Sequence, residues 1–221
     1  MKIDIQPIGH EREPVVVIED FATDPDALRA FAMTRAFGPA AHHYPGIRAA
    51  LPDDYLPTQL CGIAQVLADA FGAAGPVDVI DASYSIVTTR PENLSVGQRL
   101  PHCDAHARGR IALIHYLSSE SGTAFFRHRS TGFETVDECR AAIYTDQLAA
   151  ELRHVGPPPA AFIAGDTPLF ERVMVAEARY NRALLYRSCL LHSGAIQHDA
   201  MLSPDPAVGR LTITGFLSVG E

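Results

Sequence analysis

The feature that most constrains the fold is a succession of short apolar segments, rich in β-branched residues, that begins after Gly75. Segments of this length and composition are typical of half-buried β-strands. Five of them are separated by turn-forming residues: VDVIDASYSIVTT, GRIALIHYLS, GTAFFRH, RALLYRSCLLHSG and RLTITGFLS. This many short strands in one stretch of chain predict a mainly β fold, either a barrel or a double sheet with helices packed outside.

The chain before Gly75 is predicted to be largely helical. A helix follows the buried strand PVVVIEDF, with Thr23 or Asp24 as its N-cap and Pro25 in its first turn. Apolar residues recur at helical spacing from Leu56 to Phe71. The stretch HHYPGIRAALPDDY contains Pro and Gly and is predicted to be a loop. A later segment, DECRAAIYTDQLAAELRHVG, is predicted to be helical from its Ala, Leu and Glu content.

The length of 221 residues predicts one domain, with a helical part at about 20–75 and a β core at about 76–221. The hydrophobic fraction of 47% is ordinary for a globular protein. A net charge of −8 without basic clusters argues against binding to nucleic acid or an anionic membrane, so the expected partner is a small-molecule or peptide substrate. The oligomeric state is left open.

The cysteines and the apolar runs bear on the cellular setting. The four cysteines are scattered and form no CxxC pair, which argues against a disulfide framework and a zinc knuckle. The first residues, MKIDIQPIGHEREPVVV, lack the apolar run of a signal peptide. No apolar stretch approaches 18 residues, so no transmembrane segment is predicted. A reducing, cytoplasmic setting is therefore expected.

The segment LPHCDAH contains three candidate metal ligands within five residues. On an extended chain, residues i and i+2 point to the same face, so His102 and Asp104 can converge while Cys103 points away. A third ligand must come from a distant strand, and His192 ends an apolar run in LLHSG. Two histidines and one carboxylate form the facial set that leaves three positions open on Fe(II). The alternative interpretation is a polar turn at the end of a strand.

Oxygen chemistry with this ligand set needs a co-substrate that chelates the metal and supplies two electrons. A dicarboxylate does so if a fixed cation holds its far end. Arg210 opens the strand after His192 and can hold a carboxylate with two parallel hydrogen bonds. Thr212 faces the same side, and Tyr116 lies on the strand that follows the histidine–aspartate pair. These three residues are the candidate co-substrate ligands.

From Tyr84 to Leu217 the chain resembles the Fe(II)/2-oxoglutarate-dependent dioxygenases, particularly their prolyl-hydroxylase-like branch. The resemblance rests on features in family order: the HxD of PHCDAH, the strand ALIHYLS, the turn and strand GTAFF, and the pair LLHSG and GRLTITGFL. The opening VVVIEDFATDPDALRAFA also resembles the strand–helix entry of that branch. The connection from His192 to Arg210, which contains AMLSPDPAV, is longer than is usual there.

The resemblance implies a double-stranded β-helix, or jelly-roll, core of the cupin-like kind. It implies Fe(II) held by His102, Asp104 and His192, with Mn(II), Co(II) or Zn(II) as surrogates. It further implies that 2-oxoglutarate chelates the metal and that Arg210 anchors its far carboxylate, assisted by Tyr116 and Thr212. The implied reaction hydroxylates a substrate C–H bond and releases succinate and CO2. The identity of the substrate is left open.

Two other functions use the same fold. A cupin-like metalloprotein would need the three metal ligands but no buried cation at Arg210. A non-catalytic jelly-roll binding protein would need neither, although an unpaired buried aspartate is costly.

Several further residues have a purely structural interpretation as well as a functional one. His106 is interpreted as a loop residue beyond the ligand pair, and His115 as a core or surface residue. His128 is interpreted as part of a solvated loop, with contact to an anionic substrate as the alternative. Tyr84 is interpreted as a core residue that could instead line the pocket. His42 and His43 are interpreted as exposed loop residues, with a place in a lid as the alternative. Cys103 and Cys189 are interpreted as buried small hydrophobes.

Overall fold

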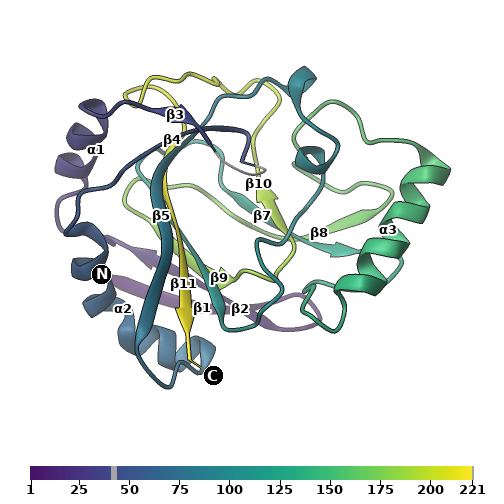
Figure 1. Cartoon of the computed structure of the whole chain (residues 1–221), viewed down its shortest axis with the longest axis horizontal. Helices are drawn as coiled ribbons and strands as arrows, with labels where there is room; N and C mark the ends of the chain where they lie inside the picture. Colours follow the sequence, from purple (N-terminus) through teal and green to yellow (C-terminus); the bar gives the residue numbers. More distant parts are fainter. Residues whose placement is uncertain (41–43, 221) are drawn as a thin grey trace.

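The computed structural model describes residues 1–40 and 44–220 and consists of two antiparallel sheets with three α-helices (Figure 1). The larger sheet has the strand order β1-β2-β9-β6-β11-β5-β4-β3, and the smaller has the order β10-β7-β8. The elements in chain order are β1 (Lys2–Ile8), β2 (Glu13–Glu19), α1 (Pro25–Met33), β3 (Gly38–Pro39), β4 (Gly46–Ala49), α2 (Tyr55–Phe71), β5 (Val77–Val87), two short 3-10 helices (Pro91–Asn93 and Gly97–Arg99), β6 (Arg110–Tyr116), β7 (Thr123–His128), α3 (Ala141–Val155), β8 (Phe170–Ala176), β9 (Ala183–Arg187), β10 (His192–Gly194) and β11 (Leu211–Val219).

The apolar core has three parts, which follow from the alternation of side chains along the strands. One part lies between the sheets and joins Tyr116 and Tyr186 of the large sheet to Phe125 of the small one. A second packs the other face of the large sheet against the helices, with Ile63 and Ile213 among its members. The third lies on the α3 side of the small sheet. Figure 1 shows α1 and α2 on the left flank and α3 on the right, beside β7 and β8.

A row of residues in register runs across four strands of the large sheet, β4, β5, β11 and β6, and includes side chains of the site described below. Arg48 pairs with Ser85, Ser85 with Thr212, and Thr212 with Tyr116. Residues that lie directly opposite each other in a sheet project from the same face. Because Tyr116 belongs to the core between the sheets, the whole row faces the small sheet.

Most of the predicted elements are confirmed, including the mainly β class. The side chain of Asp24 caps α1 by accepting a hydrogen bond of 2.9 Å from the backbone N–H of Ala27. Helix α2 ends at Gly72, whose φ of 73° is in the left-handed region that favours glycine. No helix within the described ranges is both long and apolar enough to cross a bilayer.

The prediction that HHYPGIRAALPDDY is entirely loop is wrong, because Gly46–Ala49 form strand β4. This short segment is held by its pairing with β5, which local composition does not reveal. Gly46 permits the approach, since a Cβ there would lie 1.9 Å from the carbonyl oxygen of Ile86. Strands β1 and β8 were not predicted, and RALLYRSCLLHSG divides into β9 and β10, which belong to different sheets.

His115 of β6 is a buried core residue on the helix-covered face of the large sheet. Asn181 accepts a hydrogen bond from Ala22 N–H through Oδ1 and donates one to Ala22 C=O through Nδ2, which fixes its amide orientation. The imidazole Nε2–H therefore donates to Asn181 Oδ1 at 3.0 Å, and Nδ1 accepts from the Tyr55 hydroxyl at 3.0 Å. Burial lowers the pKa of His115 to about 4. The fold holds this ring in its neutral form.

We expect His115 to make the protein less stable in acid. Because the pKa of His115 is lower in the folded protein than in the unfolded chain, the unfolded chain binds more protons in acid. The stabilisation of the fold by neutral His115 is therefore complete above about pH 6.5 and is lost as pH falls towards 4. Between pH 7.5 and 4.5 the loss is roughly 2–3 kcal/mol. Urea unfolding of His115→Gln should show a pH dependence flatter by this amount, whereas the exposed His154→Gln should match the wild type. Equal slopes for His115→Gln and the wild type would contradict the prediction.

Candidate metal centre

His102, Asp104 and His192 meet at one edge of the small sheet. Each offers one ligand atom, and these atoms lie within 4.8 Å of one another. Asp104 Oδ1 lies 3.6 Å from His102 Nε2, and Asp104 Oδ2 lies 3.3 Å from His192 Nε2. The two imidazole centroids are 4.5 Å apart. The structure therefore brings together the three residues that the sequence singled out, and their role as metal ligands stays a prediction.

Backbone pairing holds the three side chains in this arrangement. His102 and His192 form an antiparallel bridge in which each backbone N–H donates to the other residue's carbonyl at 2.9 Å. The N–H of Asp104 donates to the carbonyl of Ser188 at 2.8 Å. β10, which begins at His192, is in turn paired with β7. The ligand atoms are thus positioned by the sheet rather than by mobile side-chain contacts.

The ring of His192 is oriented for coordination through Nε2. Its Nδ1–H donates to the carbonyl of Leu190 at 2.9 Å, which leaves the Nε2 lone pair directed towards Asp104. The side chains of His102, Asp104 and His192 are 50%, 21% and 7% exposed, respectively. The ligand atoms are therefore shielded at His192 and reachable from solvent at His102.

The electrostatics of the cluster favour a cation. Burial opposes the ionisation of Asp104, but His192, His102 and Arg48 together outweigh it and lower the pKa of this carboxyl. Burial likewise opposes a charge on His192, but Asp104 and the hydrogen bond to Leu190 raise the pKa of this imidazole. A proton and a metal ion compete for the same nitrogen, so metal affinity is expected to rise with pH as the imidazole loses its proton.

Arg210, Thr212 and Tyr116, the candidate co-substrate ligands, lie near one another in the structure. Arg210 is 9% exposed and donates through Nε to the carbonyl of Ser121 at 2.6 Å and through Nη2 to that of Gly122 at 3.2 Å. Its guanidinium carbon lies 5.7 Å from the centroid of the Tyr116 ring, and Tyr116 is the register partner of Thr212. The long connection from His192 does not move Arg210 away from this face.

Tyr44 lies beside the same group of residues, and the sequence did not point it out. Its hydroxyl is buried and has no hydrogen-bond partner among the residues that the structure describes. Burial raises the pKa of this phenol, while the nearby charges of Arg210 and Arg48 and the hydroxyls of Thr212 and Ser85 act in the opposite direction. No local signal in the loop sequence distinguishes this tyrosine, because its place depends on the pairing of β4 with β5.

The other candidate residues lie outside the cluster. His106 contacts the carbonyl of Val136 through Nδ1 at 2.7 Å and is not a member of the metal-ligand group. The hydroxyl of Tyr84 donates to the carbonyl of Leu28 at 2.7 Å, on the α1 side of the sheet, so this residue belongs to the core. Cys189 is buried as predicted, whereas Cys103 is only partly buried. His42 and His43 lie outside the described residues.

The prediction that His128 belongs to a solvated loop is wrong. It ends β7, and its side chain is fully buried under α3. Its Nε2 contacts the carboxylate of Glu151 at 2.8 Å, and its Nδ1 contacts the hydroxyl of Thr131 at 3.0 Å. A basic, polar stretch of sequence suggested exposure, but a carboxylate on α3 supplies the partner that permits burial.

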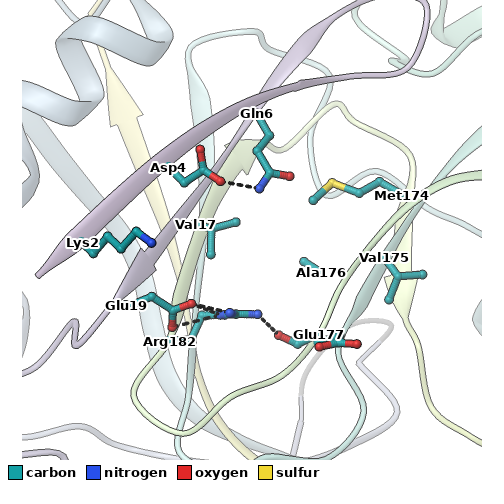
Figure 2. Close-up of a pocket in the computed structure, with 10 residues that line it drawn as sticks. All are labelled: Lys2, Asp4, Gln6, Val17, Glu19, Met174, Val175, Ala176, Glu177 and Arg182. Carbon is teal, nitrogen blue, oxygen red and sulfur yellow. Dashed lines mark hydrogen bonds and ion pairs between the residues drawn. The ribbon is translucent and has the colours of Figure 1, made fainter.

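A cavity of about 320 Å³ lies at the β1 edge of the large sheet, between β1–β2 and β8 (Figure 2). Its charged groups bind one another. Arg182 donates through Nε to both carboxylate oxygens of Glu19, at 3.1 and 3.2 Å, and through Nη1 to the carbonyl of Glu177 at 2.8 Å. A second cavity of about 370 Å³ lies beside Arg29 and Tyr180. No member of the metal cluster lines either cavity.

Several solved structures are similar to this chain. HygX from Streptomyces hygroscopicus, solved with nickel, 2-oxoglutarate and hygromycin B, is 14% identical with a TM-score of 0.46, over 93% of this chain and 82% of that one. A novel N-substituted L-amino acid dioxygenase from Burkholderia ambifaria AMMD is 13% identical with a TM-score of 0.45, over 96% and 84%. AviO1 from Streptomyces viridochromogenes Tue57 is 16% identical with a TM-score of 0.40, over 90% and 86%.

At the level of sequence, no curated protein matches the chain. Residues 1–217 match a family described as "Family of unknown function (DUF6445)". This match extends over the helices, both sheets and all the residues of the metal cluster and the Arg210 pocket. The chain therefore belongs to the family DUF6445.

Proposed function

We propose that this protein is an Fe(II)- and 2-oxoglutarate-dependent oxygenase that hydroxylates a small-molecule or peptide substrate. The observation that carries the proposal is the combination of two arrangements. One is the His102–Asp104–His192 cluster, and the other is the buried, unpartnered hydroxyl of Tyr44 beside Arg210. When bound, Fe(II) and 2-oxoglutarate supply oxidising power for C–H hydroxylation, with release of succinate and CO2.

The path of the chain supports a jelly-roll core for the single domain. β5 lies in the large sheet, the His102 segment bridges to the small sheet, and β6 returns to the large one. β7 and β8 then lie in the small sheet, β9 in the large, β10 in the small and β11 in the large. This alternation between two facing antiparallel sheets is the pattern of a jelly roll. It brings His192 and Arg210 to the same core, although a long connection separates them.

The three donors fit the proposed metal. Two imidazole nitrogens and one carboxylate oxygen suit Fe(II), and they equally suit Mn(II), Co(II) or Zn(II) as surrogates. The backbone pairing of His102 with His192 and the hydrogen bond from His192 to Leu190 fix the donors before a metal arrives. The open side at His102 leaves room for further ligands.

The group formed by Arg210, Tyr44 and Thr212 is suited to hold the far carboxylate of 2-oxoglutarate. A guanidinium has five N–H donors, and Arg210 uses only part of them on the carbonyls of Ser121 and Gly122. The buried Tyr44 hydroxyl makes no hydrogen bond of good geometry within the described residues, although the Thr212 and Ser85 hydroxyls lie beside it, so it can donate to a carboxylate. A carboxylate accepting from both groups would satisfy them, and the Thr212 hydroxyl lies on the same face.

Aromatic side chains keep water away from the inner side of the cluster. The ring of Tyr186 lies 4.8 Å from that of His192 and 5.1 Å from that of Phe125, and both aromatic residues are fully buried. Charge-assisted hydrogen bonds are stronger where water is excluded. The protein's contribution is therefore to hold the metal at the mouth, to anchor the co-substrate in a dry pocket and to leave the outer side for the substrate.

Succinate release tests the proposed function directly. With Fe(II), 2-oxoglutarate and O2, the wild type should form succinate in the presence of at least one member of a panel of small molecules and peptides. Formation should stop when any one of the three components is omitted, because each is needed for the coupled reaction. A wild type that binds metal but not 2-oxoglutarate would contradict the oxygenase and favour a cupin-like metalloprotein. Binding of both without succinate would favour a non-catalytic protein.

A further inference from the structure

Arg48 lies in the row that carries the co-substrate residues. It belongs to β4 and pairs with Ser85, which pairs with Thr212 on β11. Cross-strand partners project from the same face of a sheet, so the side chain of Arg48 emerges on the face that bears Thr212. Its guanidinium carbon lies 4.8 Å from the centroid of the Tyr44 ring, which holds the guanidinium beside the site. Arg48 is thus a second guanidinium next to the Arg210 pocket.

The donors of Arg48 are only partly used within the protein. Its Nε is buried without a hydrogen-bond partner in the described part of the chain. Its Nη1 lies 3.5 Å from a carboxylate oxygen of Asp81, at the limit of a hydrogen bond, and the Asp81 side chain is 56% exposed. Arg127, which is similarly shielded, instead contacts Glu134 at 2.5 Å and Glu171 at 2.9 Å. A buried arginine with a purely structural role is expected to have close carboxylate partners, as Arg127 does.

The balance of charge in the loaded site leaves Arg48 available. The two positive charges of the metal and the one of Arg210 are matched by Asp104 and the two carboxylates of 2-oxoglutarate. After chelation, 2-oxoglutarate has one free carboxylate, which the buried Arg210 and Tyr44 hydroxyl can hold. Arg48 is more exposed than Arg210, at 20% for its side chain, so it is the more accessible of the two guanidinium groups. Within the described residues, the only ion pair of Arg48 is the 3.5 Å contact with the exposed Asp81 carboxylate, so its guanidinium can attract one further anion.

We infer that Arg48 is a specificity-determining residue that binds an oxyanion of the substrate, a carboxylate or a phosphate. The inference rests on the proposed function and narrows its substrate class to anionic molecules. A guanidinium stacked on a ring and carrying unused donors is suited to planar, two-point recognition of such a group. Neutral analogues of the substrate would lose this contact and leave the buried Nε unpaired.

The test uses Mn(II)-loaded full-length protein saturated with 2-oxoglutarate, because Mn(II) enhances the nuclear relaxation of small molecules bound near it. Acetate and inorganic phosphate are the anionic probes, and acetamide is the neutral one. We expect acetate or phosphate, but not acetamide, to show saturable relaxation enhancement. Arg48→Gln should raise the dissociation constant of the bound anion at least about tenfold. Arg48→Lys should have an intermediate effect, and the exposed Arg90→Gln should match the wild type.

The affinity for 2-oxoglutarate, measured calorimetrically on the same variants, separates the possible outcomes. Arg48→Gln should bind 2-oxoglutarate nearly as well as the wild type, which also shows that the variant is folded. A tenfold loss of 2-oxoglutarate affinity in Arg48→Gln would assign Arg48 to the co-substrate and overturn the inference. Anion binding that is equal in Arg48→Gln and the wild type would also overturn it. A preference for acetate indicates a carboxylate substrate, and a preference for phosphate indicates a phosphorylated one. Arg48-dependent anion binding in a wild type that does not bind 2-oxoglutarate would reject the oxygenase but keep the anion site.

Discussion

Asp104→Ala is expected to abolish the binding of Fe(II), Mn(II), Co(II) and Zn(II) while the protein remains folded. The substitution removes the carboxylate that lies between the two imidazoles, at 3.6 Å from His102 and 3.3 Å from His192. Loss of a ligand should cost more than the 10–100-fold that follows loss of an outer hydrogen-bond partner. We therefore expect affinity to fall by at least about a hundredfold, or about 2.7 kcal/mol. Calorimetric titration with Mn(II) or Zn(II) measures this.

The fold is expected to tolerate this change. Asp104 is held through its backbone N–H, which donates to Ser188 and is retained in the variant. Its side chain lies at the mouth of the site rather than in the packed core. The free energy of unfolding should therefore change by no more than about 1 kcal/mol. His106→Ala is the matched control, because this histidine is in the same segment but outside the cluster. Equal loss of metal in both variants would argue against Asp104 as a ligand.

Arg210→Ala is expected to retain the metal but to bind 2-oxoglutarate at least tenfold more weakly, about 1.4 kcal/mol or more. A hydrogen bond to a charged group contributes about 1.5–3 kcal/mol, and the Arg210 guanidinium is buried beside Tyr116, where such bonds are stronger. Calorimetric titration of the metal-loaded protein with 2-oxoglutarate gives the affinity for the co-substrate. A separate titration with metal shows whether the His102–Asp104–His192 cluster is intact.

Two companion variants separate charge from geometry in the Arg210 pocket. Arg210→Lys should recover little affinity, because an ammonium group cannot reproduce the planar fork that also bonds the carbonyls of Ser121 and Gly122. Tyr44→Phe should lower the affinity for 2-oxoglutarate by about two- to tenfold, because it removes one hydrogen bond that contributes about 0.5–1.5 kcal/mol. Unchanged affinity in Arg210→Ala, with a wild type that binds, would place the far carboxylate elsewhere.

The elements that the sequence predicted well are those whose signal is local. Alternation of apolar and polar residues marked β5, β6 and β11, and helical spacing marked α2, because side-chain direction repeats every two residues in a strand and every 3.6 in a helix. The convergence of His102 with Asp104 was predictable for the same reason, because residues i and i+2 of an extended segment face the same way, although the structure places Asp104 in a bend rather than in a strand.

The meeting of distant residues needed more than local pattern. His192 and Arg210 were assigned to the site from the order of motifs along the chain, and the structure brings each of them to the predicted neighbours. Their ligand roles remain predictions that the variants above test. The long connection between them left their separation in space undetermined, because a flexible loop closes over many lengths at little cost.

Local sequence pattern was enough to predict the mainly β class, most of the strands and helices, and the convergence of His102 with Asp104. The tertiary structure was needed to show that Gly46–Ala49 form a strand, that Tyr44 lies beside Arg210 and Arg48, and that His128 is buried against Glu151. The physical reason is that a residue's backbone preference depends on its near neighbours, whereas strand pairing and burial depend on which distant segments bury apolar surface together.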